Sequence, residues 1–229
     1  MNRNRYVMVF DFETDGKSPD SCNIVQIAAV PVDLRNLTIL TDDIFNIDIC
    51  PDELAKKLTT GERGDYIEAH EDTINWHSMI QNKSVSEVVE RWERGFSEKD
   101  GWEEFGRYIK NYNKGGKWDQ LCIPGGQNIR GYDLPICERY AKKYKALPFS
   151  KRDVFDLMDF TRAWFLFCPN PPASLSMDNL RDYFGIEKDG GHDAKKDVLD
   201  TSRLITKFLG LHERIAPKIN WTSETTQKV

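Results

Sequence analysis

Four carboxylates and one imidazole stand in three separate segments, each where a strand is expected to end or a helix to begin. Asp11 and Glu13 close YVMVFDFE (6–13), Asp133 lies in GGQNIRGYDLPI (125–136), and His192 and Asp197 lie in GGHDAKKDVLD (190–200). Such a set could hold two divalent cations about 4 Å apart for phosphodiester hydrolysis. Oxygen ligands favour hard ions such as Mg²⁺ or Mn²⁺, and a neutral His can accept the proton of an attacking water.

Two of these segments also have simpler interpretations. Side chains alternate along a strand, so Asp11 and Glu13 share one face, and two like charges in a buried strand are costly unless a cation lies between them. The strand could equally have ended, which would leave both acids in solvent. Asp133 precedes a helix with Pro135 in its first turn, and an N-cap is a common role for such an Asp.

The third segment is ambiguous in the same way. Residues five apart on a helix lie roughly 140° from each other around the axis, so His192 and Asp197 share no face of one helix. They can converge only if His192 lies before the helix, on the glycine loop, with Asp193 as the N-cap. No segment decides the function alone, but the three together have the composition of a metal-assisted hydrolase.

The elements around these residues predict an α/β fold. Segments 6–13, 23–32 and 39–49 have the pattern of three antiparallel strands, and 121–126 and about 152–155 of further short strands. Apolar spacing predicts helices over EDTINWHSMI, VSEVVERW and GWEEFGRYIKNY, with weak order around GERGD. Further helices are expected at 133–146, from about 156, in SLSMDNLRDYFGI ending at Gly185, and at 194–209.

One domain over residues 1–229 is the expected organisation. Its core comprises about 6–49 and 121–209, residues 50–120 form a helical insert, and 213–229 form a C-terminal tail. The central sheet is expected to be mixed, with three antiparallel strands followed by parallel strands, and to be flanked by helices. The chain is long enough to bury a substantial core.

Composition narrows the class of protein. The net charge is −5, so attraction of a nucleic acid would depend on local basic patches or metal ions. The five cysteines form no CxxC pair, which argues against a zinc ribbon and a secreted disulfide scaffold. The N-terminus lacks the apolar segment of a signal peptide, and no apolar run approaches membrane-spanning length. We therefore expect a soluble, cytoplasmic protein, in the host cytoplasm if a phage encodes it.

The motifs DFET, NIRGYDLP and HDAKKD resemble the three exonuclease motifs of the DEDDh family, the ribonuclease H-like 3′–5′ exonucleases. The resemblance spans residues 6 to about 209 and includes every motif residue. The length and the TINWH helix are most similar to exonuclease A of large tailed phages. The resemblance implies two Mg²⁺ or Mn²⁺ ions and release of nucleoside 5′-monophosphates from 3′ ends.

The resemblance also implies roles for individual residues. Asp11, Glu13 and Asp197 would ligate the metal that carries the attacking water, and Asp133 would support the second metal. His192 would be the general base. The residues implied to bind substrate are Phe12, Thr14 and Asn128.

Three positions depart from the family pattern or need a separate role. Asp15 intrudes after Thr14, and its charge could weaken substrate binding or move the loop. Gln26 is expected to be a polar core residue, and Asp156 a structural or capping residue.

Several other residues have two open interpretations. The basic segment 138–152, with Lys195 and Lys196, could follow a phosphate backbone or be a solvated surface. Trp76, Trp92 and Trp102 could stack on bases, but their helical spacing is more typical of core. His70, His77 and His212 show no partner pattern.

A 3′–5′ exonuclease acting on single-stranded nucleic acid, with DNA favoured over RNA, is the leading hypothesis. An exoribonuclease of the oligoribonuclease kind is the alternative, and a catalytically silent nucleic-acid-binding module is less favoured because all five motif residues are present. A Ser–His–Asp hydrolase ranks last because no GxSxG motif is present. A homodimer is possible, although the sequence shows no clear interface.

Overall fold

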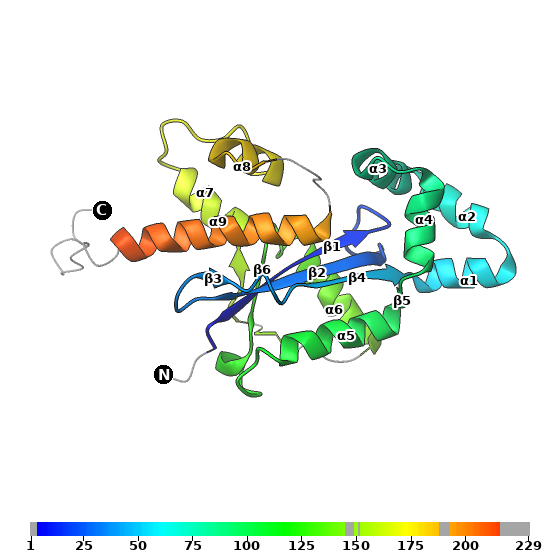
Figure 1. Cartoon of the computed structure of the whole chain (residues 1–229), viewed down its shortest axis with the longest axis horizontal. Helices are drawn as coiled ribbons and strands as arrows, with labels where there is room; N and C mark the ends of the chain where they lie inside the picture. Colours follow the sequence, from blue (N-terminus) through cyan, green and yellow to red (C-terminus); the bar gives the residue numbers. More distant parts are fainter. Residues whose placement is uncertain (1–3, 145–148, 151, 188–192, 216–229) are drawn as a thin grey trace.

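A mixed sheet with helices on both faces forms the centre of the molecule (Figure 1). The structure is a computed structural model that describes residues 4–144, 149–150, 152–187 and 193–215. The strands are β1 (Tyr6–Thr14), β2 (Ile24–Asp33), β3 (Thr38–Ile39), β4 (Phe45–Cys50), β5 (Phe96–Ser97), β6 (Ile123–Gly126) and β7 (Phe155–Asp156). Their order is β5-β4-β2-β1-β6-β7, with β3 paired to β2.

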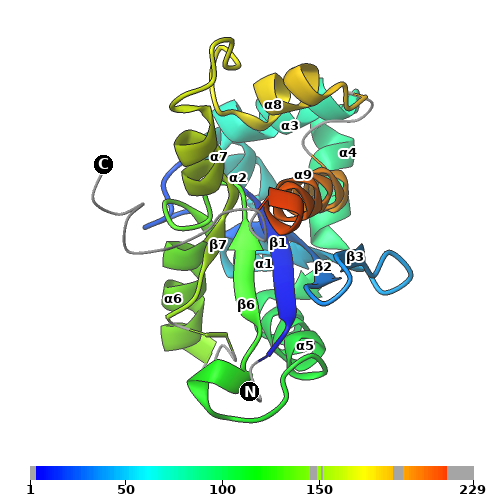
Figure 2. The same cartoon turned by 90° about the vertical axis from the view of Figure 1, so that its left-hand side faces the viewer.

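The pairing directions confirm the predicted mixed sheet. β1, β2 and β4 are antiparallel neighbours, whereas β6 lies parallel to β1 and β7 parallel to β6. Figure 2 shows β1 and β6 side by side with β7 beyond them. The predicted third strand at 39–49 is instead two strands, β3 and β4, separated by a turn.

Alternation along β1 directs its side chains into two separate cores. Val7 and Val9 pack in the cluster under α7 (Leu157–Phe165) and α9 (Ala194–Ile215), while Met8 and Phe10 pack with α5 (Glu98–Lys110) and α6 (Asp133–Tyr144). Figure 1 shows α9 on one face of the sheet and α5 on the other. Residues 11 and 13 continue the odd-numbered series, which places both acids on the α9 face.

The last helix covers the sheet through one apolar stripe. Its buried positions include Ala194, Val198, Ile205 and Phe208, whose spacing of three to four residues per turn keeps them on one face. The prediction of 194–209 was short, since α9 continues to Ile215. Asp197 lies in its first turn, beside the stripe and over the end of β1.

The helical insert places four helices beyond the carboxyl end of β1 (Figure 1). They are α1 (Asp52–Thr60), α2 (Arg63–Ala69), α3 (Glu71–Gln81) and α4 (Val85–Glu93). The expectation of weak order around GERGD is wrong, because α1 ends at Gly61 with a φ of 76° and α2 begins two residues later. Glycine adopts this left-handed conformation without a steric penalty, so the glycine closes one helix and lets the next begin.

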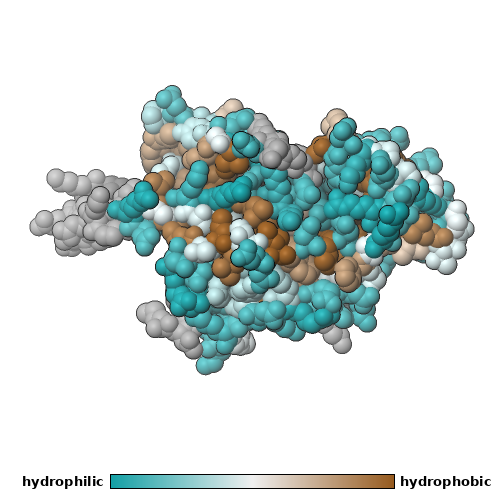
Figure 3. Space-filling model, viewed as in Figure 1, coloured by the Kyte–Doolittle hydropathy of each residue, from teal (hydrophilic) through white to brown (hydrophobic). Residues whose placement is uncertain are grey.

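Both predicted ends of α8 (Met177–Phe184) are confirmed. The Ser176 side chain accepts a hydrogen bond from the N–H of Asn179, and Gly185 has a φ of 64°. Among the described residues no helix has the length and apolarity needed to cross a membrane. On the face shown in Figure 3, hydrophobic residues gather in the middle, between α9 and α5, and hydrophilic residues dominate the ends.

The insert is attached to the end of β1 by a buried carboxylate, Asp15. Only 1% of Asp15 is exposed. Its side chain accepts hydrogen bonds from Asn23 N–H (2.6 Å), the Asn23 side-chain amide (2.8 Å) and the Tyr66 hydroxyl (2.8 Å). The expectation that Asp15 adds charge beside the substrate is therefore wrong, because its oxygens are occupied inside the protein.

Two histidines of the insert strengthen this attachment. His70 Nδ1 lies 3.0 Å from the Asp15 carbonyl oxygen, and His77 Nε2 lies 3.0 Å from the Thr14 carbonyl oxygen. A carbonyl can only accept, so each of these ring nitrogens must carry the hydrogen. The insert and the strand that carries Asp11 and Glu13 are therefore held together through consecutive residues, Thr14 and Asp15.

Replacing Asp15 by Ala should destabilise the protein by about 2 to 4 kcal/mol, because the buried donors of Asn23 and Tyr66 would lose their acceptor. Urea unfolding followed by circular dichroism measures this change. Asp20→Ala, in the exposed part of the same loop, is the matched control and should leave the midpoint almost unchanged. Equal stability of the two variants would contradict the proposed attachment.

Candidate active site

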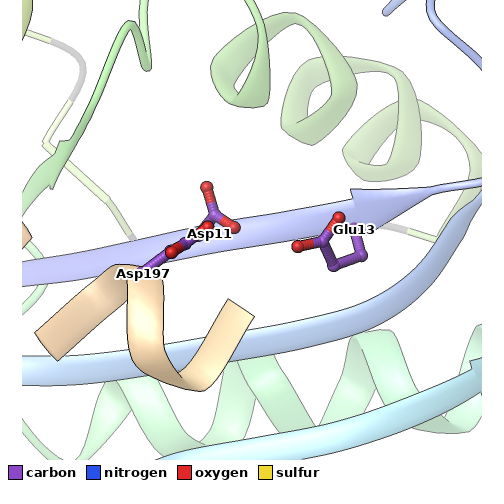
Figure 4. Close-up of side chains that lie close together, drawn as sticks. All are labelled: Asp11, Glu13 and Asp197. Atoms are coloured by element: carbon purple, nitrogen blue, oxygen red, sulfur yellow. The ribbon is translucent and has the colours of Figure 1, made fainter. Parts of the chain in front are cut away.

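Three of the predicted carboxylates form one cluster. Asp11, Glu13 and Asp197 each offer an oxygen, and these oxygens all lie within 4.8 Å of one another. Figure 4 shows Asp11 and Glu13 on β1 and Asp197 on the first turn of α9. Glu13 is buried, Asp11 is half-buried, and the Asp197 side chain is 14% exposed. The cluster is therefore sheltered but reachable from one side.

Two features of local structure produce this convergence. Asp11 pairs with Ala28 and Glu13 with Gln26 in the antiparallel register, so both acids point to the same face. Asp197 lies at the N-terminus of α9, where the helix dipole and the free N–H groups stabilise negative charge. Asp193 begins that helix as predicted, accepting a hydrogen bond from Lys195 N–H at 2.9 Å.

Asp133 reaches the same region from the other face of the sheet. It is the first residue of α6 and is 3% exposed. Its Oδ1 accepts a hydrogen bond from the N–H of Phe12 at 3.1 Å, which ties it to the residue between the two acids of β1. The carboxylate thus bonds across to β1, a contact that the N-cap interpretation did not anticipate.

Burial and mutual repulsion of the carboxylates raise the pKa values of this cluster. Burial, followed by the charge of Asp133, raises the pKa of Asp11 well above its usual range. Burial, followed by the charge of Asp197, does the same to the pKa of Glu13. Burial raises the pKa of Asp133 to about 7, against the opposing effect of the Phe12 N–H. Without added positive charge, the cluster therefore favours its protonated forms.

The remaining predicted residues are dispersed. His192 lies outside the described residues. Asn128 is exposed, with a φ of 53°, and its N–H donates to Asp156 Oδ1 at 3.1 Å. Asp156 also caps α7 through Met158 N–H at 3.0 Å, which confirms the structural role predicted for it. Gln26 is 2% exposed and donates to Asn46 at 2.9 Å, which confirms a polar core position.

A pocket of about 630 Å³ opens beside the cluster. The sequence-predicted residues Phe12 and Thr14 line it together with Glu13. The opposite wall comes from the insert, with Thr73, Trp76 and His77 of α3 among its residues. Asn128 is not among the described residues that line it. One carboxylate of the cluster thus faces a cavity of the size of a small ligand.

Sequence reasoning did not single out Tyr132, which lines this pocket. The Tyr132 hydroxyl lies 2.7 Å from Thr14 Oγ1 and donates to the Gly16 carbonyl at 3.0 Å. Its position directly before Asp133 in the sequence could have indicated that it lies near the site. Of the three tryptophans, Trp92 and Trp102 are buried in the core, whereas Trp76 is 38% exposed on the pocket wall. His77, which showed no partner pattern, is buried behind that wall.

The basic segment 138–152 is used largely for structure. Lys143 pairs with Asp52 and Glu98, each at 2.8 Å, and Arg139 donates to the backbone carbonyls of Pro19 and Cys22. These contacts fasten α6 to the insert and to the loop after β1. Residues 145–148 and 151 of the segment lie outside the described residues.

The architecture matches solved structures of exonucleases. E. coli exonuclease I in complex with a dT13 oligonucleotide aligns with a TM-score of 0.66 and 17% identity, over 93% of this chain and 43% of that chain. Cell-death related nuclease 4 aligns with a TM-score of 0.63 and 14% identity, over 91% and 65%. A 3′-exonuclease that recognises the 3′ end of the histone mRNA stem-loop aligns with a TM-score of 0.58 and 15% identity, over 91% and 83%.

The chain has the ribonuclease H-like exonuclease fold. It spans less than half the length of exonuclease I and about two thirds of cell-death related nuclease 4. No protein-family model and no curated protein sequence matches the chain. The likeness is therefore one of structure, at low sequence identity.

The cluster has the chemistry of a divalent-cation site. Its donors are all carboxylate oxygens, which suit Mg²⁺ or Mn²⁺ better than softer ions. Burial and the neighbouring acids raise the pKa values of Asp11 and Glu13, so a positive charge nearby would favour their joint ionisation. A bound cation would provide that charge, and cation binding would release protons.

Metal-dependent stability should therefore change with pH. Asp11, Glu13 and Asp133 have folded-state pKa values above their unfolded values, so the folded protein binds more protons, and its metal-free stability falls as pH rises through this interval. For Asp133 alone the loss between about pH 4 and pH 7 is roughly 3 to 5 kcal/mol. Mg²⁺ should therefore raise the unfolding temperature more at about pH 8 than at about pH 5.

Differential scanning fluorimetry with Mg²⁺ or EDTA at both pH values measures this effect. Asp133→Asn is the informative variant, because it removes one of the titrating groups and should flatten the pH dependence of the metal-free protein. A Mg²⁺ effect of equal size at both pH values would argue against ionisation of the cluster on metal binding.

Proposed function

We propose that this chain is a DEDDh-type 3′–5′ exonuclease that hydrolyses the terminal phosphodiester bond of a single-stranded nucleic acid. The observation that carries the proposal is the convergence of Asp11, Glu13 and Asp197 within 4.8 Å beside an open pocket. The shared fold with exonucleases supports it.

Four carboxylates would hold the cations. Asp11, Glu13 and Asp197 form one ligand set, and Asp133, bonded to the Phe12 N–H, supports Asp11 from the other face of the sheet. Two Mg²⁺ or Mn²⁺ ions bound there would neutralise the charge that develops on the phosphate and lower the pKa of the attacking water. A zinc-bound form of the E. coli exonuclease I complex with single-stranded DNA, which aligns with this chain at 17% identity, supports the assignment.

His192 would accept the proton of the attacking water. It directly precedes Asp193, the residue that caps α9, and Asp197 lies one turn into that helix. The place of His192 in the sequence, one residue before the cap of α9, is the ground for assigning it to the cluster. A His with its ordinary pKa is partly neutral near pH 7, as a general base must be.

The pocket would receive the 3′-terminal nucleotide. Phe12 and Thr14 line it next to Glu13, and Trp76 offers a partly exposed indole from the opposite wall. Stacking of a base on an aromatic ring is tolerant of sequence. Lys17, which is exposed at the rim, would meet phosphate there. These features favour single strands, whose bases are free to stack.

DNA is our preferred substrate class, and an exoribonuclease of the oligoribonuclease kind is the alternative. The similarity to exonuclease A of large tailed phages rests on chain length and on the TINWH segment, and it remains a prediction. The single-domain organisation, the homodimer and the cytoplasmic location also remain predictions.

The decisive experiment incubates the protein with 5′-labelled single strands of DNA and of RNA, with Mg²⁺, with Mn²⁺ and with EDTA. We expect a ladder that shortens from the 3′ end, nucleoside 5′-monophosphates as products, and no cleavage in EDTA. Asp11→Asn should lower the rate by about 10³-fold or more, because the cation site loses a ligand. Asp42→Asn, in the exposed turn before β4, is the control. Absence of cleavage with every metal, or full activity of Asp11→Asn, would contradict the proposal.

Two further variants separate the roles within this assay. His192→Ala should lose most of the rate and keep metal binding, because His192 is assigned proton transfer only. Asp197→Ala should lose both. Mn²⁺ binding measured by isothermal titration calorimetry, without nucleic acid, distinguishes them, and equal loss of metal binding in both variants would contradict the assignment of His192.

Trp76→Ala should raise the KM for single-stranded oligonucleotides with little change in kcat, because it removes a stacking surface from the pocket wall and leaves every carboxylate of the cluster in place. The expected effect is about tenfold or more, from the 1 to 3 kcal/mol typical of base–aromatic stacking. Met79→Ala is the matched control, since Met79 lies on the same helix, is 72% exposed, and is not among the described residues that line the pocket. Equal KM values for the two variants would exclude the stacking role.

A further inference from the structure

Arg181, on α8, is a buried cation next to the carboxylate cluster. It is 1% exposed, which is unusual for an arginine unless its charge is fully paired. Its guanidinium bonds to three carboxylates, namely Asp197 through Nη2, Asp200 at 2.9 Å through Nε, and Asp178 at 3.1 Å through Nη1. One of these partners, Asp197, belongs to the candidate metal site.

The geometry gives the guanidinium two distinct neighbours on one helix. Asp197 and Asp200 are three residues apart and therefore share a face of α9. Asp200 is completely buried and also accepts from Arg203 at 2.9 Å. Asp200 thus anchors Arg181, while Arg181 holds Oδ1 of Asp197 at the edge of the cluster. The charge of Arg181 also extends to Asp11, where it opposes the rise in pKa.

We propose that Arg181 is a resident counter-cation of the metal site. It offsets the repulsion among Asp11, Glu13 and Asp197 while no divalent ion is bound, and it weakens divalent-ion binding because like charges repel. The inference rests on the proposed function in one respect, that these three acids bind a divalent cation.

A purely structural ion pair would behave differently. It would stabilise the metal-free and the metal-bound protein by the same amount, and its removal would leave metal affinity unchanged. A counter-cation is coupled to the metal, and this coupling is reciprocal. The free energy by which Arg181 weakens metal binding equals the free energy by which bound metal reduces the stabilisation of the fold by Arg181. Metal affinity therefore separates the two roles.

The test compares Arg181→Met with Arg203→Met in two measurements. The first is Mn²⁺ binding by calorimetry at about pH 8 without nucleic acid, and the second is the unfolding temperature with and without Mn²⁺. Arg181→Met should bind Mn²⁺ about tenfold more tightly than wild type, unfold at a lower temperature without metal, and gain more from Mn²⁺. Arg203→Met removes a cation that bonds to the same Asp200 but is 54% exposed, so its affinity should stay within about twofold of wild type.

A second variant keeps the test informative if Arg181→Met folds poorly. Asp200→Asn leaves the arginine charge in place with one partner fewer, so Mn²⁺ affinity should fall, opposite to the change in Arg181→Met. Folding of Arg181→Met only when Mn²⁺ is present would support the proposal. Unchanged or weaker Mn²⁺ binding by Arg181→Met, or failure to fold in saturating Mn²⁺, would overturn it. Wild-type protein that binds no Mn²⁺ would instead overturn the proposed function.

Discussion

The repulsion among buried carboxylates at the end of β1 is the constraint on which the rest of the site depends. Asp11 and Glu13 stand on one face because a strand alternates, and Asp197 and Asp133 arrive from two helices that begin at the same edge. Such a cluster costs free energy unless positive charge is near. Helix N-termini, the Phe12 N–H and two arginines provide part of it, and a divalent cation would provide the remainder.

The two arginines approach the cluster from opposite sides. Arg181 contacts Asp197 from α8. Arg91, on α4 of the insert, is held by Asp48 at 2.6 Å and opposes the rise in the pKa of Glu13. Neither has a counterpart in the motif that suggested the chemistry. The charge balance of the site therefore depends in part on elements outside the three motifs.

The strands and helices could be predicted because they depend on short-range patterns, whereas the grouping of their acids was predicted from the three motifs taken together and from their resemblance to the exonuclease motifs. Alternation predicts β1, helical spacing predicts α9, and the glycine and capping residues predict the ends of α8. Asp15 was misjudged because burial of a polar residue depends on partners distant in sequence, here Tyr66 of the insert. The position of Arg181 beside the carboxylates could not be predicted for the same reason, since its surroundings form only when α8 packs on α9. Tyr132 and Trp76 belong to a pocket made by three segments, 12–17, 72–77 and Tyr132, which the chain separates by more than fifty residues each.

The junction between insert and sheet connects the wall of the pocket to the strand that carries Asp11 and Glu13. Thr14 and Asp15 directly follow Glu13, and they receive hydrogen bonds from His77, His70 and Tyr66 of the insert. Trp76, next to His77 on α3, therefore has its position fixed relative to Glu13 through a few backbone bonds. Asp15 and His77 are buried at this junction, so a shift of the insert would break hydrogen bonds to β1 and its following loop. The wall that would hold the terminal base is thus bonded directly to the strand whose acids would hold the cations, and such a connection would help to place a scissile bond accurately.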